Sequence, residues 1–238
     1  MENNRFGALV LGVCILLGLL GMGYSLSQAA IQFKLLDRSV TVKGLSEREY
    51  SADIVIWPIQ FTLAANDLQS LYGSLDQQTE TIRAFLVKNG VSESEITIAA
   101  PAITDKLAQQ YGGGPRAEFR YSAIQSVTVY SKNIDQVRNA MGLMSQLGKQ
   151  GVVISRGNYE TRTEYLFTRL NEIKPEMIEE ATRKAREVAE KFAQDSQSQL
   201  GKIKRASQGQ FSISERDKNN RHIKRIRVVS TVEYYLSD

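Results

Sequence analysis

The first part of the chain is one long apolar run between charged flanks. Residues 6–24 (FGALVLGVCILLGLLGMGY) contain no charged side chain. About 20 apolar helical residues span the ~30 Å hydrocarbon core of a bilayer, whereas the apolar region of a cleaved signal peptide has roughly 7–15 residues. We therefore predict a short tail over residues 1–5, a transmembrane signal-anchor helix over residues 6–28, and a linker over residues 29–37.

A cleaved signal peptide remains an alternative to this anchor. Ser27 and Ala29 place small residues at the −3 and −1 positions of a cleavage after Ala29. The positive charges on the two sides of the run are nearly balanced and orient it weakly. The short tail and the long following domain favour export. We predict a single-pass protein of the cytoplasmic membrane with its C-terminal domain in the periplasm, or a periplasmic or secreted protein if the segment is removed.

Beyond residue 38 the hydrophobic pattern changes to short alternating segments and helical periods. Strands are expected over residues 39–45, 53–65, 95–107, 118–131, 152–167, 202–214 and 223–236, and helices over residues 67–89, 133–148 and 174–200. The order β-β-α-β-β-α-β-α-β-β predicts an α+β domain over residues 38–238, with a mixed or antiparallel sheet and helices packed on it.

Composition restricts the chemistry of this domain. The 238 residues are 42% hydrophobic and 24% charged, with one cysteine and one histidine, His222. This excludes an intramolecular disulfide, a cysteine-based zinc site and a multi-histidine metal site. We expect no cofactor, no metal and no enzyme activity. The cations beside His222 are expected to depress its pKa.

Two short motifs were weighed as chemical sites. Gly112-Gly113-Gly114-Pro115 lacks the Lys-Ser/Thr pair of a phosphate loop and is interpreted as a hairpin tip. Ser46-Glu47-Arg48-Glu49 is interpreted as a charged turn between two strands. Its two carboxylates leave a hydrolase open as an alternative.

The net charge of +4 is concentrated at the C-terminal end. Residues 201–238 contain nine Lys and Arg against four Asp and Glu, so this segment carries +5. A basic sheet face there would attract anionic lipid or another anionic partner. Nucleic acid is not expected, because the domain is predicted to be exported and aromatic residues for base stacking are few. The residues of this predicted anion-binding patch are Lys202, Lys204, Arg205, Lys224, Arg225 and Arg227.

Three segments together resemble a known family. Val42-Lys43-Gly44-Leu45-Ser46-Glu47, followed by Ala52-Asp53, resembles the opening motif of SIMPL-domain proteins, also called the domain-of-unknown-function 541 group. The alanine-rich helix that leads into Leu200-Gly201-Lys202 and the closing strand Val228–Tyr234 are similar to later landmarks of that family. The resemblance covers residues 38–238.

The resemblance implies a bacterial secreted, periplasmic or envelope-anchored protein with an α+β fold, a role in stress tolerance and a tendency to form homo-oligomers. Binding of an envelope protein partner is our own alternative to self-association. The resemblance implies no established enzyme activity and no catalytic residues. The motif positions are Gly44, Glu47 and Asp53. We interpret them as structural: Gly44 would permit a tight turn or bulge, and the two carboxylates would accept hydrogen bonds from backbone donors.

Overall fold

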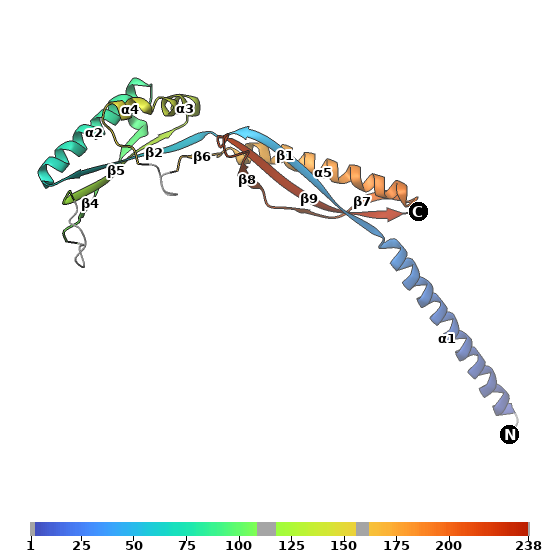
Figure 1. Ribbon diagram of the computed structural model, residues 1–238. Helices are drawn as coiled ribbons and strands as arrows, with labels where there is room; N and C mark the ends of the chain where they lie inside the picture. Colours follow the sequence, from blue (N-terminus) through green and yellow to red (C-terminus); the bar gives the residue numbers. More distant parts are fainter. Residues whose placement is uncertain (1–2, 109–117, 156–161, 238) are drawn as a thin grey trace. The chain divides into compact units, whose positions relative to one another are not determined.

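The computed structural model describes residues 3–108, 118–155 and 162–237 (Figure 1). Their contacts divide the chain into two compact units. Unit 1 comprises Met1–Glu47, Lys174–Ser212 and Arg227–Asp238, and unit 2 comprises Arg48–Ile173 and Ile213–Ile226. The chain has an apolar N-terminal helix and two antiparallel sheets with helices packed on them. The predicted α+β fold is therefore confirmed.

The N-terminal helix α1 (Asn3–Leu36) is long enough to cross a membrane. Its segment Leu9–Ala29 has 21 residues, a mean hydropathy of 2.2 and no buried residue. At 1.5 Å per residue this segment is about 32 Å long, close to the hydrocarbon thickness of a bilayer. The prediction of an apolar helix here is confirmed.

The first sheet has strand order β1-β9-β7, with β8 also pairing with β9. Its strands are β1 (Ser39–Ser51), β7 (Gln199–Gln208), β8 (Ser212–Glu215) and β9 (Ile223–Ser237). β7 and most residues of β1 and β9 belong to unit 1, whereas β8 from Ile213 onward belongs to unit 2. Helix α5 (Leu170–Asp195) lies along this sheet (Figure 1). The core between them includes Val42, Val232 and Tyr234.

Small side chains bring α5 close to its sheet. The buried residues of the helix recur at every fourth position: Met177, Ala181, Ala185, Ala189 and Ala193. A row with this spacing lies on one face of an α-helix. The larger apolar residues Val188 and Phe192 of the same helix are not part of this row and are 38% and 53% exposed.

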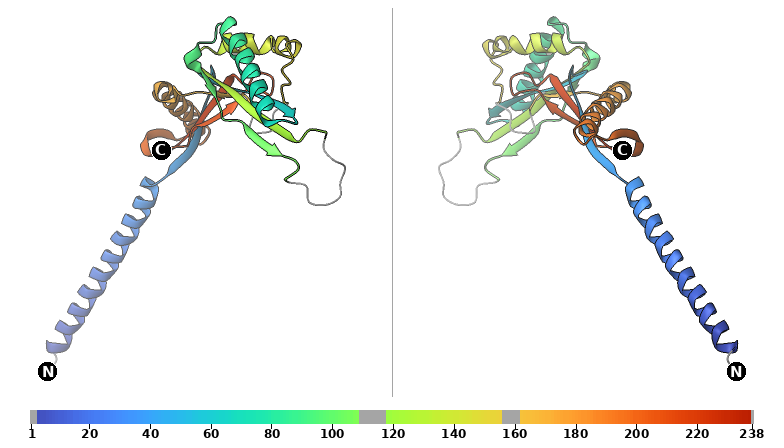
Figure 2. Two further views of the ribbon diagram at one scale, coloured as in Figure 1. Left: turned by 90° about the vertical axis from the view of Figure 1, so that its left-hand side faces the viewer. Right: turned by 90° about the vertical axis from the view of Figure 1, so that its right-hand side faces the viewer.

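The sheet of unit 2 has strand order β3-β5-β2-β6, with β4 also pairing with β5. Its strands are β2 (Ile54–Ala65), β3 (Ile96–Ile98), β4 (Ala102–Asp105), β5 (Tyr121–Ser131) and β6 (Glu164–Leu166). The helices of unit 2 are α2 (Leu68–Lys88), the 3₁₀ helix η1 (Glu93–Glu95), α3 (Ile134–Gly142) and α4 (Ser145–Lys149). Figure 2 shows α2 lying across the sheet. Trp57, Phe61 and Val127 of the sheet and Leu71 and Ile82 of α2 belong to one core.

Several element boundaries differ from the prediction. The first strand continues to Ser51, so the segment Ser46–Glu49 is strand and not a turn. The strand expected over residues 95–107 is divided into β3 and β4 around Pro101, and the one expected over residues 202–214 is divided into β7 and β8 near Gly209. Helix α5 begins at Leu170, four residues before the predicted start.

The segment expected as a strand over residues 152–167 is only partly a strand. Ile154 forms an isolated bridge with Phe61, and β6 covers three residues. Residues 156–161 of this segment and the predicted hairpin tip at Gly112–Pro115 lie outside the described residues.

Pro58 lies inside β2 without interrupting its pairing with β5, where it is opposite Thr128. Farther along β2, the Gln60 carbonyl accepts the Ser155 N–H, and the Thr62 N–H donates to the Val153 carbonyl. Both bonds lie on the side of β2 that faces away from β5. Backbone groups of a strand alternate in direction, so the position of the missing Pro58 donor also faces away from β5. Proline is tolerated here because its missing N–H removes no hydrogen bond from the pairing with β5.

Candidate functional site

Gly44 is a point of close approach between a strand and a helix. It lies inside β1, and a Cβ atom added to it would overlap the carbonyl oxygen of Ala181 and the backbone nitrogen of Ala185. The expected tight turn or bulge is not what Gly44 provides. It provides room for the α5 backbone, since any side chain there would hold helix and sheet apart.

The Asp53 carboxylate fixes a loop distant in sequence. It accepts hydrogen bonds from the Thr168 backbone N–H at 2.9 Å and from the Thr168 hydroxyl at 3.0 Å, and Arg169 Nε lies 3.4 Å away. Burial opposes ionisation, but the bonds from Thr168 and the charge of Arg169 outweigh it and lower the pKa of Asp53. The backbone donor predicted for this carboxylate is thus Thr168. Glu47 is exposed on β1.

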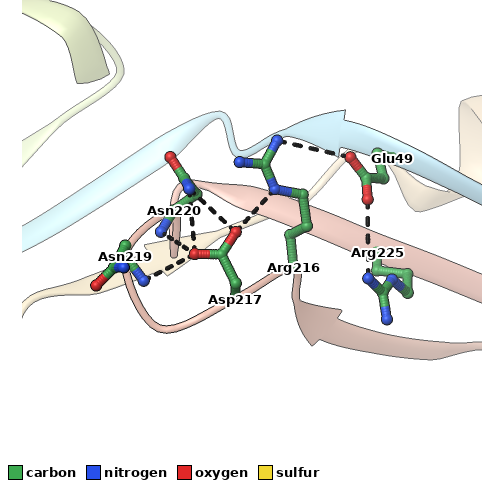
Figure 3. Close-up of polar contacts among 6 residues, drawn as sticks. All are labelled: Glu49, Arg216, Asp217, Asn219, Asn220 and Arg225. Carbon is green, nitrogen blue, oxygen red and sulfur yellow. Dashed lines mark hydrogen bonds and ion pairs between the residues drawn. The ribbon is translucent and has the colours of Figure 1, made fainter.

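Glu49, the other carboxylate of the predicted turn, belongs to a chain of charged contacts in unit 2 (Figure 3). Its two oxygens lie 3.8 Å from Arg216 Nη1 and 3.9 Å from Arg225 Nη2. Arg216 also donates through Nε to Asp217 at 2.9 Å. Arg216 thus lies between two carboxylates, and Glu49 is engaged in ion pairs.

Asp217 organises the turn between β8 and β9. Its Oδ1 accepts the backbone N–H groups of Asn219 and Asn220, both at 2.8 Å, and the Asn220 side-chain amide lies within bonding distance of both oxygens (Figure 3). Arg216 and then the Asn220 amide are the main causes that lower the pKa of Asp217. A carboxylate that accepts backbone N–H groups two and three residues ahead is typical of an Asx turn.

A second cluster surrounds Glu215, the last residue of β8. Arg221 Nε donates to Glu215 Oε1 at 2.8 Å, Arg162 Nη2 donates to Oε2 at 3.2 Å, and Lys224 Nζ lies 3.8 Å from Oε1. The Lys224 side chain is only 9% exposed. Burial is the main cause that lowers its pKa. Glu215 acts in the opposite direction, and Arg221 and Arg162 reinforce the decrease.

His222 lies beside a small hollow of unit 2. The hollow has a volume of about 210 Å³ and is also lined by Ser51, Lys132 and Asp135, among others. The pKa of His222 is lowered, as predicted, but burial is the leading cause and Arg138 the next, so the sequence neighbours are not the principal source. The ring makes no hydrogen bond with any described residue, and its centroid lies 6.0 Å from that of Tyr165.

The six basic residues predicted as a patch do not share one environment. Side chains alternate along β9, so the buried Lys224 and the more accessible Arg225 point to opposite faces of the strand. In unit 1, Lys204 Nζ lies 2.7 Å from Asp37 and 3.4 Å from Glu233, and Asp37 is the main cause that raises its pKa. Arg205 is paired in register with Glu233, whereas Lys202 and Arg227 are exposed.

The sequence could not indicate Arg162 or Glu215 as members of a site. They are 53 residues apart, and neither lies in a recognisable motif. Among residues 3–108, 118–155 and 162–237, no group of three or more His, Cys, Asp or Glu side chains is arranged to hold a metal ion. The clusters around Glu49 and Glu215 are therefore described by their ion pairs.

Comparison with known proteins adds one result to this geometry. No curated protein matches the chain. A family model described as SIMPL, protein of unknown function (DUF541), matches residues 40–230, which contain Gly44, Asp53, α5 and the first half of β9. This match covers most of the 238 residues. The chain therefore belongs to the SIMPL (DUF541) family.

Proposed function

We propose that the protein is a non-enzymatic, membrane-tethered envelope protein. Its N-terminal helix would lie in the cytoplasmic membrane, and its SIMPL domain would lie in the periplasm and act by self-association in stress tolerance. The observation that carries the proposal is the apolar segment Leu9–Ala29, which contains no buried residue and whose helix continues to Leu36, just before the family match begins at residue 40.

The continuous helix supports a retained anchor over a cleaved signal. The possible cleavage point after Ala29 lies inside α1, so the helix would have to unwind before a protease could reach that bond. Intact-mass measurement of the protein extracted from membranes should give the full-length chain. A mature chain that starts at Ala30, recovered in the soluble periplasmic fraction, would contradict the anchor.

The lone cysteine makes the orientation directly measurable. Cys14, in the apolar helix, is the only cysteine of the chain. In a Cys14→Ser background, Ser74→Cys places a thiol on the exposed surface of α2. A membrane-impermeant maleimide should label this thiol in spheroplasts without lysis. Labelling that requires lysis would place the domain in the cytoplasm and overturn the periplasmic assignment.

Carboxylates of unit 2 that are engaged in structural contacts support the non-enzymatic part of the proposal. Asp53 holds Thr168, Glu49 contacts two arginines, and Asp217 holds the β8–β9 turn. Replacing Glu49 by Gln is then expected to change the stability of the protein, and it is not expected to abolish an enzymatic reaction.

Self-association is supported by β1, which is an end strand of its sheet. The unpaired edge of a strand is a template for pairing with another chain. Lys43, Leu45 and Glu47 alternate with the buried positions of β1 and are exposed. If two copies paired antiparallel about Leu45, Lys43 of each would lie opposite Glu47 of the other. Opposite charges directly across a strand pair are favourable.

A charge-exchange series tests this arrangement. Lys43→Glu alone and Glu47→Lys alone place like charges opposite each other and should weaken the dimer, and the double exchange should restore it. Sedimentation of the full chain in detergent at several protein concentrations measures the dissociation constant. Equal association by all four proteins would exclude pairing through β1, and a concentration-independent monomer would exclude self-association altogether.

Binding of anionic lipid is the alternative function. The bond between Lys204 and Asp37, the first residue after α1, places the basic start of β7 next to the end of the apolar helix. Lys202 and Arg205 are exposed there. To test this, the full chain is reconstituted into liposomes of neutral or anionic lipid, and the liposomes are isolated by flotation. Protease is then added to measure whether the lipid protects this segment from cleavage. Protection should require anionic lipid, weaken with salt and be lost in Lys202→Glu/Arg205→Glu. Protection that is equal in both lipids would exclude this alternative.

A further inference from the structure

We infer that the hollow beside Glu215 in unit 2 is a binding site for a small oxyanion, a carboxylate or a phosphate group. The hollow has a volume of about 260 Å³. It is lined by Arg162, Glu164, Tyr165, Leu166, Glu215 and Arg221. This inference concerns other residues than the proposed membrane and self-association functions and does not depend on them.

Positive charge exceeds negative charge at this site. Three cations, those of Arg162, Arg221 and Lys224, lie within 4 Å of one carboxylate, that of Glu215. The second acid of the hollow, Glu164, still leaves one cation in excess. Lys224 is the most buried of these groups, and a buried charge is costly unless it is paired, so a bound anion would complete the neutralisation of the cluster.

Both arginines line the hollow, and each bonds with Glu215 through one nitrogen only among the described residues. Arg162 bonds with Glu215 through Nη2, and Arg221 bonds with it through Nε. No other nitrogen of these two guanidinium groups makes a hydrogen bond within the described residues. A guanidinium group presents five N–H donors in a planar fork that suits the paired oxygens of a carboxylate or phosphate. Both arginines can therefore hold a ligand without releasing Glu215.

Lys224 is the third element of the site. Its side chain is 9% exposed, and the 3.8 Å contact with Glu215 is too long for a hydrogen bond. Within the part of the chain that the structure describes, its ammonium group has no hydrogen-bond partner. A charged side chain that is this little exposed is costly unless an opposite charge lies close to it. Through its charge, Lys224 would stabilise an anion next to Glu215.

The other walls restrict the ligand. Leu166 and the half-buried ring of Tyr165 provide apolar surface, which suits the carbon body of an organic acid or a phosphate ester. The Glu164 carboxylate repels excess negative charge. A monoanionic head group is thus favoured over a dianion, and a carboxylate is expected to bind more tightly than phosphate at pH 8.

Thermal melting of the full chain in detergent tests the site. Sodium acetate and sodium phosphate are compared with sodium chloride at matched ionic strength. Acetate should raise the melting temperature more than chloride does. Phosphate should also raise it more than chloride does, but by less than acetate. If phosphate is the stronger ligand, the oxyanion site stands and the carboxylate preference is wrong. If neither anion exceeds chloride, the site is wrong.

Three variants separate ligand binding from structural support. Arg162→Gln changes a side chain that is 46% exposed and should lower the affinity for acetate at least tenfold. The control Arg186→Gln, on the exposed face of α5, should leave the affinity for acetate unchanged. Glu215→Gln removes the internal carboxylate, so it should lower the melting temperature without ligand and enlarge the rise that acetate produces. If Glu215 had a purely structural role, acetate would raise the melting temperature of Glu215→Gln no more than that of the wild type. Equal acetate responses in wild type, Arg162→Gln and Glu215→Gln would overturn the inference.

Discussion

Gly44 of β1 lies directly against Ala181 of α5, and a methyl group on Gly44 would overlap the Ala181 carbonyl oxygen. The obstacle is backbone, so no side-chain rotation can relieve it. The contact joins the opening family motif to the alanine-rich helix, two segments that are far apart in the sequence. It explains why both the glycine and the row of alanines are needed: each removes atoms from the same interface.

Gly44→Ala should therefore destabilise the protein by about 1–3 kcal/mol, because the added methyl group overpacks the helix–sheet interface. Urea unfolding of the full chain, followed by circular dichroism, measures the change. Gly73→Ala is the matched control. Gly73 lies in α2 with open space around it, so alanine there should stabilise by about 0.5–1 kcal/mol. Equal effects of the two substitutions would contradict the close approach.

Asp53→Asn should destabilise the protein by about 1–3 kcal/mol at neutral pH, since the ionised carboxylate accepts the Thr168 bonds and attracts Arg169. The pKa of Asp53 is lowered from its usual 3.8 in the folded state. Its contribution is thus fully present above that value and is lost as the pH falls through the lower folded pKa. The wild-type and variant stabilities should converge in acid, whereas Asp76→Asn, on the exposed side of α2, should change little.

The buried pair of Thr79 and Gln125 should show energetic coupling. Thr79 Oγ1 donates to Gln125 Oε1 at 3.2 Å, and Gln125 Nε2 donates to the Ala99 carbonyl at 2.9 Å. Thr79→Val and Gln125→Leu each leave a buried polar partner unsatisfied and should each cost about 1–3 kcal/mol. The double variant should cost less than the two single changes together, by roughly 1 kcal/mol. Simple additivity in denaturant unfolding would show that the bond is unimportant.

Asp217→Ala should loosen the turn between β8 and β9. The substitution removes the acceptor of the Asn219 and Asn220 backbone N–H groups, so both amides should exchange with deuterium faster. Arg216 and Asn220 lower the pKa of Asp217, so the slow exchange in wild type should persist well below pH 4. The neighbouring exposed Lys218→Ala provides the control and should not alter exchange. Unchanged exchange in Asp217→Ala would show that other contacts hold the turn.

Local patterns predicted most of the helices and strands. The helical spacing of Leu71, Leu75 and Ile82 predicted α2, and Asp67 caps it by accepting the Ser70 N–H at 2.8 Å. The apolar composition of α1 was likewise sufficient, because a membrane span depends on length and hydropathy alone. Predictions failed where a strand continued through a charged segment or was divided in two: Ser46–Glu49 continues β1, and Pro101 separates β3 from β4.

The candidate site was much less predictable. The basic residues of the C-terminal segment were identified as a group from charge alone, but charge does not indicate which face of a strand a side chain occupies. Lys224 and Arg225 are adjacent in sequence and point to opposite faces of β9. The partner of Asp53, Thr168, is 115 residues away, a contact that no local pattern encodes.

The sequence by itself determined the apolar helix, the α+β class and the family, because each depends on the composition, period and order of neighbouring residues. Tertiary structure alone decided that Gly44 admits a helix backbone, that Glu49 is paired with arginines, and that Arg162, Arg221 and Lys224 converge on Glu215. The physical reason is that packing and charge pairing act through distances of a few ångströms. Those distances are set by how distant segments fold together, and the local pattern does not contain them.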